Sequence, residues 1–134
     1  RMLETEILKG APVIDRGEKL EYSLRYRAEG CENLRARLVI FAGAGPVGMA
    51  RVGRILPGAP GEHRIRLAFS LEGLAPGIYR GRLALYQAEE FGGEQILDVA
   101  DPALAFRKQS QEPDWKDGVW GHFHFPEGEM TYAD

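Results

Sequence analysis

The sequence predicts an all-β protein, folded as an immunoglobulin-like antiparallel β-sandwich. Three observations lead to this expectation. Apolar and polar residues alternate with a period of two in several segments. Turn-forming clusters rich in glycine, proline, aspartate and asparagine separate these segments about every ten residues. Glycines and prolines interrupt every window in which a helical period could develop.

Four segments show the alternation most clearly: 19–28, 34–42, 63–71 and 78–86. In the second of them we expect one inward and one outward set, namely Leu34, Ala36, Leu38 and Ile40 against Arg35, Arg37, Val39 and Phe41. Weaker strand patterns occupy 2–8, 47–55, 103–108 and 119–125. The aromatic residues expected in the core are Tyr22, Tyr26, Phe69 and Phe106.

Tyr79 follows the Pro76-Gly77 turn and opens a late strand in which Leu83 and Leu85 are expected to be buried. A tyrosine in this place is typical of a tyrosine corner, whose hydroxyl bonds back to the nearby backbone. The alternative is that Tyr79 is only a core aromatic.

Composition indicates one domain that covers residues 1–134. A net charge of −3 disfavours a nucleic-acid binder that acts through bulk charge. The single cysteine, Cys31, cannot form an internal disulfide. The longest apolar run is too short and too rich in glycine to span a bilayer. The chain begins with Arg1, which suggests a fragment of a longer protein.

Two motifs suggest chemistry that the surrounding residues do not support. Gly43-x-Gly45-x-x-Gly48 fits a dinucleotide-binding turn, but glycines interrupt the helix that must follow, so a hairpin loop is favoured. His122 and His124 share one strand face, as metal ligands do, yet a metal site needs at least three ligands. We therefore predict no metal, no cofactor and no catalytic residues.

Eight arginines form i, i+2 pairs on the four main strands, at 25/27, 35/37, 64/66 and 80/82. In an immunoglobulin-like order, one sheet face would carry Arg35, Arg37, Phe41, Arg80, Arg82 and Tyr86. Guanidinium groups bind carboxylate or phosphate, and open aromatic rings offer flat contact for sugars. The alternative is that the arginines only solubilise the sheets and deter aggregation at their edges.

The chain resembles the C-terminal carbohydrate-binding domain of Wzt-type ABC-transporter ATP-binding proteins, which export O-antigen and related polysaccharides. The resemblance lies in GEKLEYSLRYRA, LAPGIYRGRLALY, ILDVADPALAFR and DGVWGHFHFP. It implies an immunoglobulin-like domain behind an ATPase domain, at the cytoplasmic face of the inner membrane. It also implies a dimer that exchanges terminal strands, here the tail from about 112 to 134. The chain has no P-loop, consistent with an excised domain.

The resulting expectation is a non-enzymatic domain that binds the terminus of a lipid-linked glycan and so selects it for export. Its expected partners are this glycan, the nucleotide-binding and membrane subunits of the transporter, and a second copy of the chain. Arg35, Arg37, Arg80 and Arg82 would bind hydroxyl or anionic groups, Phe41 and Tyr86 would stack, and Trp120 and His122 would complete the groove. The alternatives are a structural or protein-interaction sandwich and a small metal-dependent enzyme built on His122 and His124.

Overall fold

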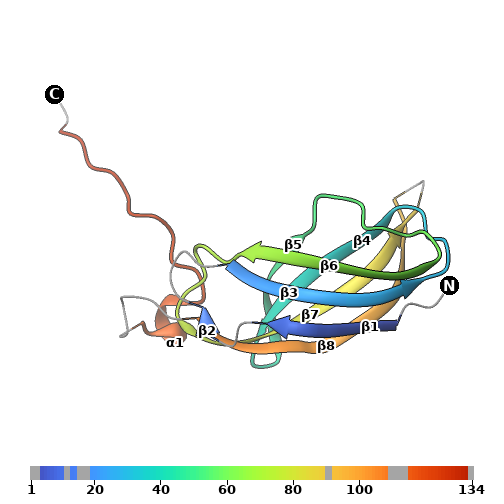
Figure 1. Cartoon of the computed structure of the whole chain (residues 1–134). Helices are drawn as coiled ribbons and strands as arrows, with labels where there is room; N and C mark the ends of the chain where they lie inside the picture. Colours follow the sequence, from blue (N-terminus) through green and yellow to red (C-terminus); the bar gives the residue numbers. More distant parts are fainter. Residues whose placement is uncertain (1–3, 11–12, 15–18, 90–91, 109–114, 133–134) are drawn as a thin grey trace.

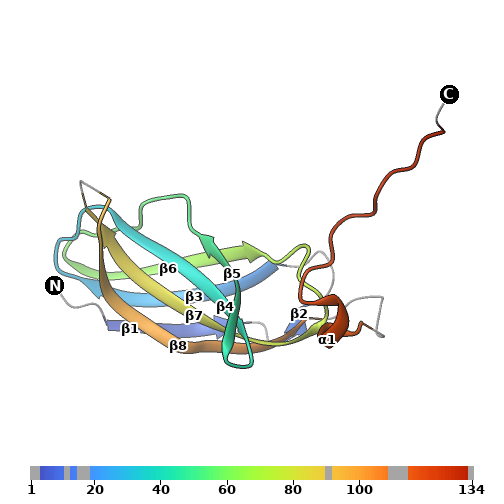
Figure 2. The same cartoon turned by 180° about the vertical axis from the view of Figure 1, so that it is seen from behind.

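The computed structural model describes residues 4–10, 13–14, 19–89, 92–108 and 115–132. They form two sheets packed face to face, seen from opposite sides in Figures 1 and 2. The elements in chain order are β1 (Glu4–Gly10), β2 (Val13–Ile14), β3 (Lys19–Ala28), β4 (Leu34–Ala42), β5 (Gly45–Arg51), β6 (Gly61–Ser70), β7 (Gly77–Ala88), β8 (Glu94–Lys108) and the helix α1 (Asp117–Trp120).

One sheet has the strand order β1-β3-β6 and the other has the order β2-β8-β7-β4-β5. Neighbouring strands run antiparallel, except that β2 runs parallel to β8. The pairs β3–β6 and β4–β7 therefore lie in separate sheets, as the sequence analysis assumed. This partition is that of immunoglobulin-like domains. The predicted all-β sandwich is confirmed.

The two-residue alternation separates core from surface as predicted. On β4, Leu34, Ala36 and Leu38 are fully buried, while Arg35 and Arg37 on the opposite face are partly exposed. Inward residues of both sheets form one apolar core. Three of the four predicted core aromatics are buried, Tyr26, Phe69 and Phe106. The side chain of Tyr22 lies outside the described residues.

Tyr79 forms the predicted tyrosine corner. Its hydroxyl donates a hydrogen bond of 2.8 Å to the carbonyl oxygen of Ala75, four residues earlier. The ring packs near Phe106 at a centroid distance of 5.8 Å. The corner fixes the path of the chain where it leaves the turn after β6 and enters β7.

The glycine-rich segment after β4 is a hairpin. Ala42 pairs with Gly45, which leaves Gly43 and Ala44 as a two-residue loop. Gly43 has a φ of 59°, as the first central position of a type II′ turn requires. The chain then continues as β5, so no helix follows Gly48 and the dinucleotide-binding interpretation is wrong.

At the opposite end of the sandwich, the turn after β3 is held to the loop before β6. The Cys31 amide donates to the Gly58 carbonyl oxygen over 2.8 Å, and the Tyr26 hydroxyl donates to the Pro57 carbonyl oxygen over 2.7 Å. Burial raises the pKa of Tyr26 to about 12, with a smaller contribution from Cys31. These bonds close the core at this end.

The prediction of a strand over 119–125 is wrong. The chain forms α1 up to Trp120 and reverses at Gly121, whose φ of 79° is incompatible with a continuous strand. The indole of Trp115 donates to the Gly121 carbonyl oxygen over 2.8 Å and stabilises this turn. Among the described residues of the tail, Phe123 makes a bridge to Leu74. No helix among the described residues is long and apolar enough to cross a membrane.

Candidate functional site

The register of β4 and β7 places the predicted site residues of these strands on one face. Arg35 lies opposite Tyr86, and Phe41 lies opposite Arg80. Arg82 lies opposite Val39, between these two rows. Directly opposed residues of an antiparallel pair share a face. The outward side of the five-stranded sheet therefore gathers one set, called the arginine face below: Arg35, Arg37, Phe41, Arg80, Arg82 and Tyr86.

Three of the four guanidinium groups of this face, those of Arg37, Arg80 and Arg82, stack on its two aromatic rings. The Cζ atoms of Arg80 and Arg82 lie 4.5 and 4.6 Å from the ring centre of Phe41. The Cζ atom of Arg37 lies 4.8 Å from the ring centre of Tyr86. These distances are within the range of favourable cation–π contact. Two cations thus share one ring, which restricts the positions of both side chains.

The expectation that Phe41 and Tyr86 lie open to a ligand is wrong. Their exposed fractions are 7% and 4%. The rings point outward, but the long side chains of Arg37, Arg80 and Arg82 lie over them. The rings therefore support the guanidinium groups from below. A stacked guanidinium keeps its N–H donors in its own plane, at the edge of the contact.

Acidic residues lie beside arginines on both sheets. On the three-stranded sheet, Glu4 and Glu62 both lie opposite Arg27, and Glu6 lies opposite Arg25. On the arginine face, Arg37 forms an ion pair with Glu94. Arg25 also lies opposite Arg64, so the three-stranded sheet has both mixed and like-charged pairs. Both sheet faces therefore combine basic and acidic positions.

Sequence analysis missed three exposed apolar side chains that border the arginine face. Met49 lies opposite Val39, and Ile96 lies opposite Tyr86. Val99 lies opposite Ala84, in the same row as Arg37. All three are exposed. The signal for them was weak, because Met49 stands among glycines and β8 bulges between its pairs with β7.

The tail residues do not join the arginine face within one chain. His122 lies beside the inward-facing Tyr79, with ring centres 6.0 Å apart. Tyr79 and Arg80 are consecutive on β7 and point to opposite faces. Trp120 packs against Trp115 at a centroid distance of 5.3 Å. Hence His122 lies on the inner side of the sheet, away from the guanidinium groups.

The tail is docked by a short antiparallel bridge to the turn between β6 and β7. The Ala75 amide donates to the His122 carbonyl oxygen over 2.9 Å, and the His124 amide donates to the Gly73 carbonyl oxygen over 2.7 Å. Beyond this bridge the chain runs away from the sandwich (Figure 1). Met130 and Tyr132 in that segment are exposed.

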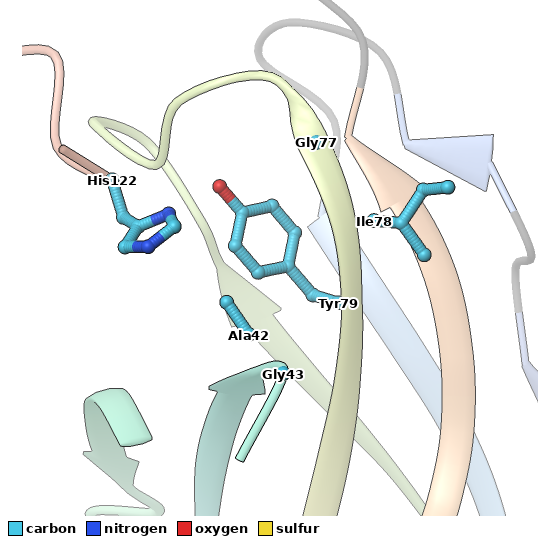
Figure 3. A pocket seen from close by; sticks show the side chains of 6 residues that line it. All are labelled: Ala42, Gly43, Gly77, Ile78, Tyr79 and His122. Atoms are coloured by element: carbon cyan, nitrogen blue, oxygen red, sulfur yellow. The ribbon is translucent and has the colours of Figure 1, made fainter. Parts of the chain in front are cut away.

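A pocket of about 290 Å³ lies where the tail meets the ends of β4 and β7 (Figure 3). Its lining residues are Ala42, Gly43, Gly77, Ile78, Tyr79 and His122. The imidazole of His122 points across it toward Tyr79 (Figure 3). The Nδ1 atom of His122 is buried, with no hydrogen-bond partner among the described residues.

The two tail histidines have different surroundings. His122 lies against Tyr79, whereas the ring of His124 lies 4.8 Å from that of Trp115. Within the described ranges, no three His, Cys, Asp or Glu side chains come together in a way that could hold a metal ion. The described residues give no support to the metal-dependent alternative.

Comparison with known proteins establishes the fold. The solved C-terminal domain of Wzt superimposes with a TM-score of 0.71 and 10% sequence identity, over 96% of this chain and 84% of that one. The resemblance expected from the sequence is thus confirmed at the level of the fold. The chain matches no family profile and no curated protein sequence.

Two other solved chains overlap less well. A CARDB domain from Pyrococcus furiosus, solved with two metal ions, gives a TM-score of 0.43 at 18% identity, over 81% of this chain and 91% of that one. A β-glucosidase from Listeria innocua, solved with glucose, gives 0.41 at 10% identity, over 79% of this chain and 16% of that one. At these scores they do not establish a shared fold.

Proposed function

We propose that this chain is a non-catalytic polysaccharide-recognition domain and that the arginine face binds the glycan. The observation that carries the proposal is the stacking of Arg80 and Arg82 on Phe41. Stacking holds both guanidinium groups in place before a ligand arrives, so less side-chain entropy is lost on binding. Their N–H donors suit the hydroxyl oxygens and carboxylates of a glycan.

We assign apolar packing against the sugar rings to exposed aliphatic residues and methionine, because the aromatic rings are covered. Met49, Ile96 and Val99 surround the guanidinium groups and can pack against the C–H faces of sugar rings. A shallow and wet surface of this kind binds weakly, because desolvation and ordering offset much of the contact energy. We expect dissociation constants in the micromolar range or above, which corresponds to about −8 kcal/mol or weaker.

The structural similarity to the C-terminal domain of Wzt supports a role for this function in an ABC exporter. In this setting the domain selects a lipid-linked O-antigen-type glycan for an ABC exporter by binding its terminus. Its partners are then the nucleotide-binding and membrane subunits of the exporter, at the cytoplasmic face of the inner membrane. A homodimer that exchanges the tail, about 112–134, agrees with the exposed Met130 and Tyr132 and with the direction of the tail (Figure 2).

A pair of charge-matched double variants tests the site. Arg80→Gln with Arg82→Gln removes two cations from the arginine face, whereas Arg64→Gln with Arg66→Gln removes two cations from the other sheet. The probe is a panel of purified O-antigen polysaccharides, titrated by isothermal calorimetry. We expect the first variant to lose about tenfold or more in affinity, because hydrogen bonds to charged groups contribute about 1.5–3 kcal/mol each.

The second variant is expected to bind like the parent chain. Equal binding by both variants and the parent, or equal losses in both, would contradict the assignment to the arginine face. Circular dichroism of both variants before titration shows that the comparison is made on folded protein. If no polysaccharide of the panel binds the parent chain, the protein-interaction alternative replaces glycan recognition.

A further inference from the structure

The pocket at the tail junction differs in character from the arginine face. Five of its six lining residues, all except His122, carry no formal charge at neutral pH. Its volume of about 290 Å³ lies near the lower end of the range for ligand sites, which suits one small ring. Gly43 and Gly77 contribute no side chains to the lining.

One residue of the pocket lining has a polar atom without a hydrogen-bond partner among the described residues. The Nδ1 atom of His122 is buried without a partner among the described residues, and such atoms are rare in folded proteins. Leaving a buried polar atom unpaired is unfavourable, and a ligand hydroxyl can restore the missing bond after a small rotation of the ring. The hydroxyl of Tyr79, which also lines the pocket, donates to the carbonyl oxygen of Ala75.

We propose that this pocket is a second binding site, which takes a single neutral sugar ring. A sugar hydroxyl supplies the partner that the His122 imidazole lacks, and the ring suits the rest of the lining, which is uncharged. An anionic sugar would need a cation, and the lining provides no arginine or lysine. None of the lining residues belongs to the arginine face, so occupancy of the pocket does not require the proposed polysaccharide site.

The test is a titration of isotope-labelled full chain, observed by NMR, with free monosaccharides. The neutral probes are glucose, galactose, mannose, rhamnose and N-acetylglucosamine, and the anionic comparator is glucuronic acid. We expect at least one neutral sugar to cause saturable shifts in the His122 imidazole and in the amides of Gly43 and Gly77. A site of this size predicts millimolar affinity, equivalent to about −4 kcal/mol.

His122→Phe keeps an aromatic ring at the junction and removes both nitrogen atoms. It should weaken binding of that sugar by about fivefold or more, the equivalent of one neutral hydrogen bond. His124→Phe is the matched control, because His124 stacks on Trp115 outside the pocket, and should stay within about twofold of the parent chain. The Arg80→Gln, Arg82→Gln double variant should also bind the monosaccharide like the parent chain.

Three outcomes would overturn the assignment: no neutral sugar shifts the pocket resonances, glucuronic acid binds as tightly as the best neutral sugar, or His122→Phe binds like the parent chain. Loss of binding in the Arg80→Gln, Arg82→Gln variant would place the sugar on the arginine face instead. If His122→Phe proves unfolded, Tyr79→Phe replaces it, because that variant removes only the hydroxyl oxygen from the pocket.

Discussion

Replacing Tyr79 by phenylalanine isolates one hydrogen bond at the point where the chain enters β7. Tyr79 is 3% exposed, and its hydroxyl donates to the carbonyl oxygen of Ala75, which is fully buried. Phe fits the same space, so the packing of the ring is retained. The carbonyl group of the buried Ala75 would lose the donor seen in the structure. We expect the variant to be destabilised by about 1–2 kcal/mol.

Urea unfolding followed by far-ultraviolet circular dichroism measures this loss. The slope of unfolding free energy against urea should not change, because the surface exposed on unfolding is the same. In a thermal scan, the midpoint should fall by roughly 3–8 °C for a domain of this size. Tyr132→Phe is the matched control, since Tyr132 is exposed, and its stability should change by less than about 0.5 kcal/mol. If Tyr79→Phe and Tyr132→Phe are equally stable, the hydrogen bond of the tyrosine corner does not stabilise the fold as argued.

Three further variants test other parts of the structure. Gly58→Ala places a Cβ atom 1.9 Å from the Cys31 carbonyl oxygen, so urea unfolding should show a loss of about 2 kcal/mol or more. Because the pKa of Tyr26 is raised from 10.0 to about 12, its contribution to stability is fully present below pH 10. That contribution, about 2–3 kcal/mol, should be lost as the pH rises from 10 to 12, and Tyr26→Phe should flatten this dependence. Phe41→Leu removes the ring beneath two guanidinium groups, so calorimetry should show weaker polysaccharide binding by a folded protein; unchanged affinity would contradict preorganisation.

The strands and their faces could be predicted because a period of two is a local property of the sequence. In 34–42 the alternation of apolar residues with arginine determines which side chains share a face. An immunoglobulin-like order then places 34–42 beside 78–86 and brings Arg35 near Tyr86 and Phe41 near Arg80. The tyrosine corner was predictable for the same reason, since Pro76-Gly77 and the strand after it are adjacent in sequence.

The covering of the rings could not be predicted from the sequence. Whether Phe41 on β4 is open or covered depends on the conformation of two long side chains on the neighbouring strand β7, those of Arg80 and Arg82. The period of two gives the direction of a side chain from the backbone but not the rotamer of its distal atoms. The same pattern is therefore compatible with an open aromatic surface and with the stacked arrangement that the structure has.

The tail was the least predictable part of the candidate site. The alternation in VWGHFHF is typical of a strand, but Gly121 adopts a left-handed conformation and the Trp115 indole binds its carbonyl oxygen. The position of His122 beside Tyr79 depends on a bridge between segments about fifty residues apart in sequence. Contacts of this kind leave no local pattern, so the pocket they form had no signal in the sequence.

The most direct test of glycan recognition by the arginine face is an NMR map of the surface that a bound polysaccharide covers. Labelled protein is titrated with a purified O-antigen polysaccharide that calorimetry shows to bind. The guanidinium signals of Arg37, Arg80 and Arg82 and the methyl signals of Ile96 and Val99 should then shift together and saturate at one affinity. Shifts confined to Arg25, Arg27, Arg64 and Arg66 on the three-stranded sheet would contradict the account.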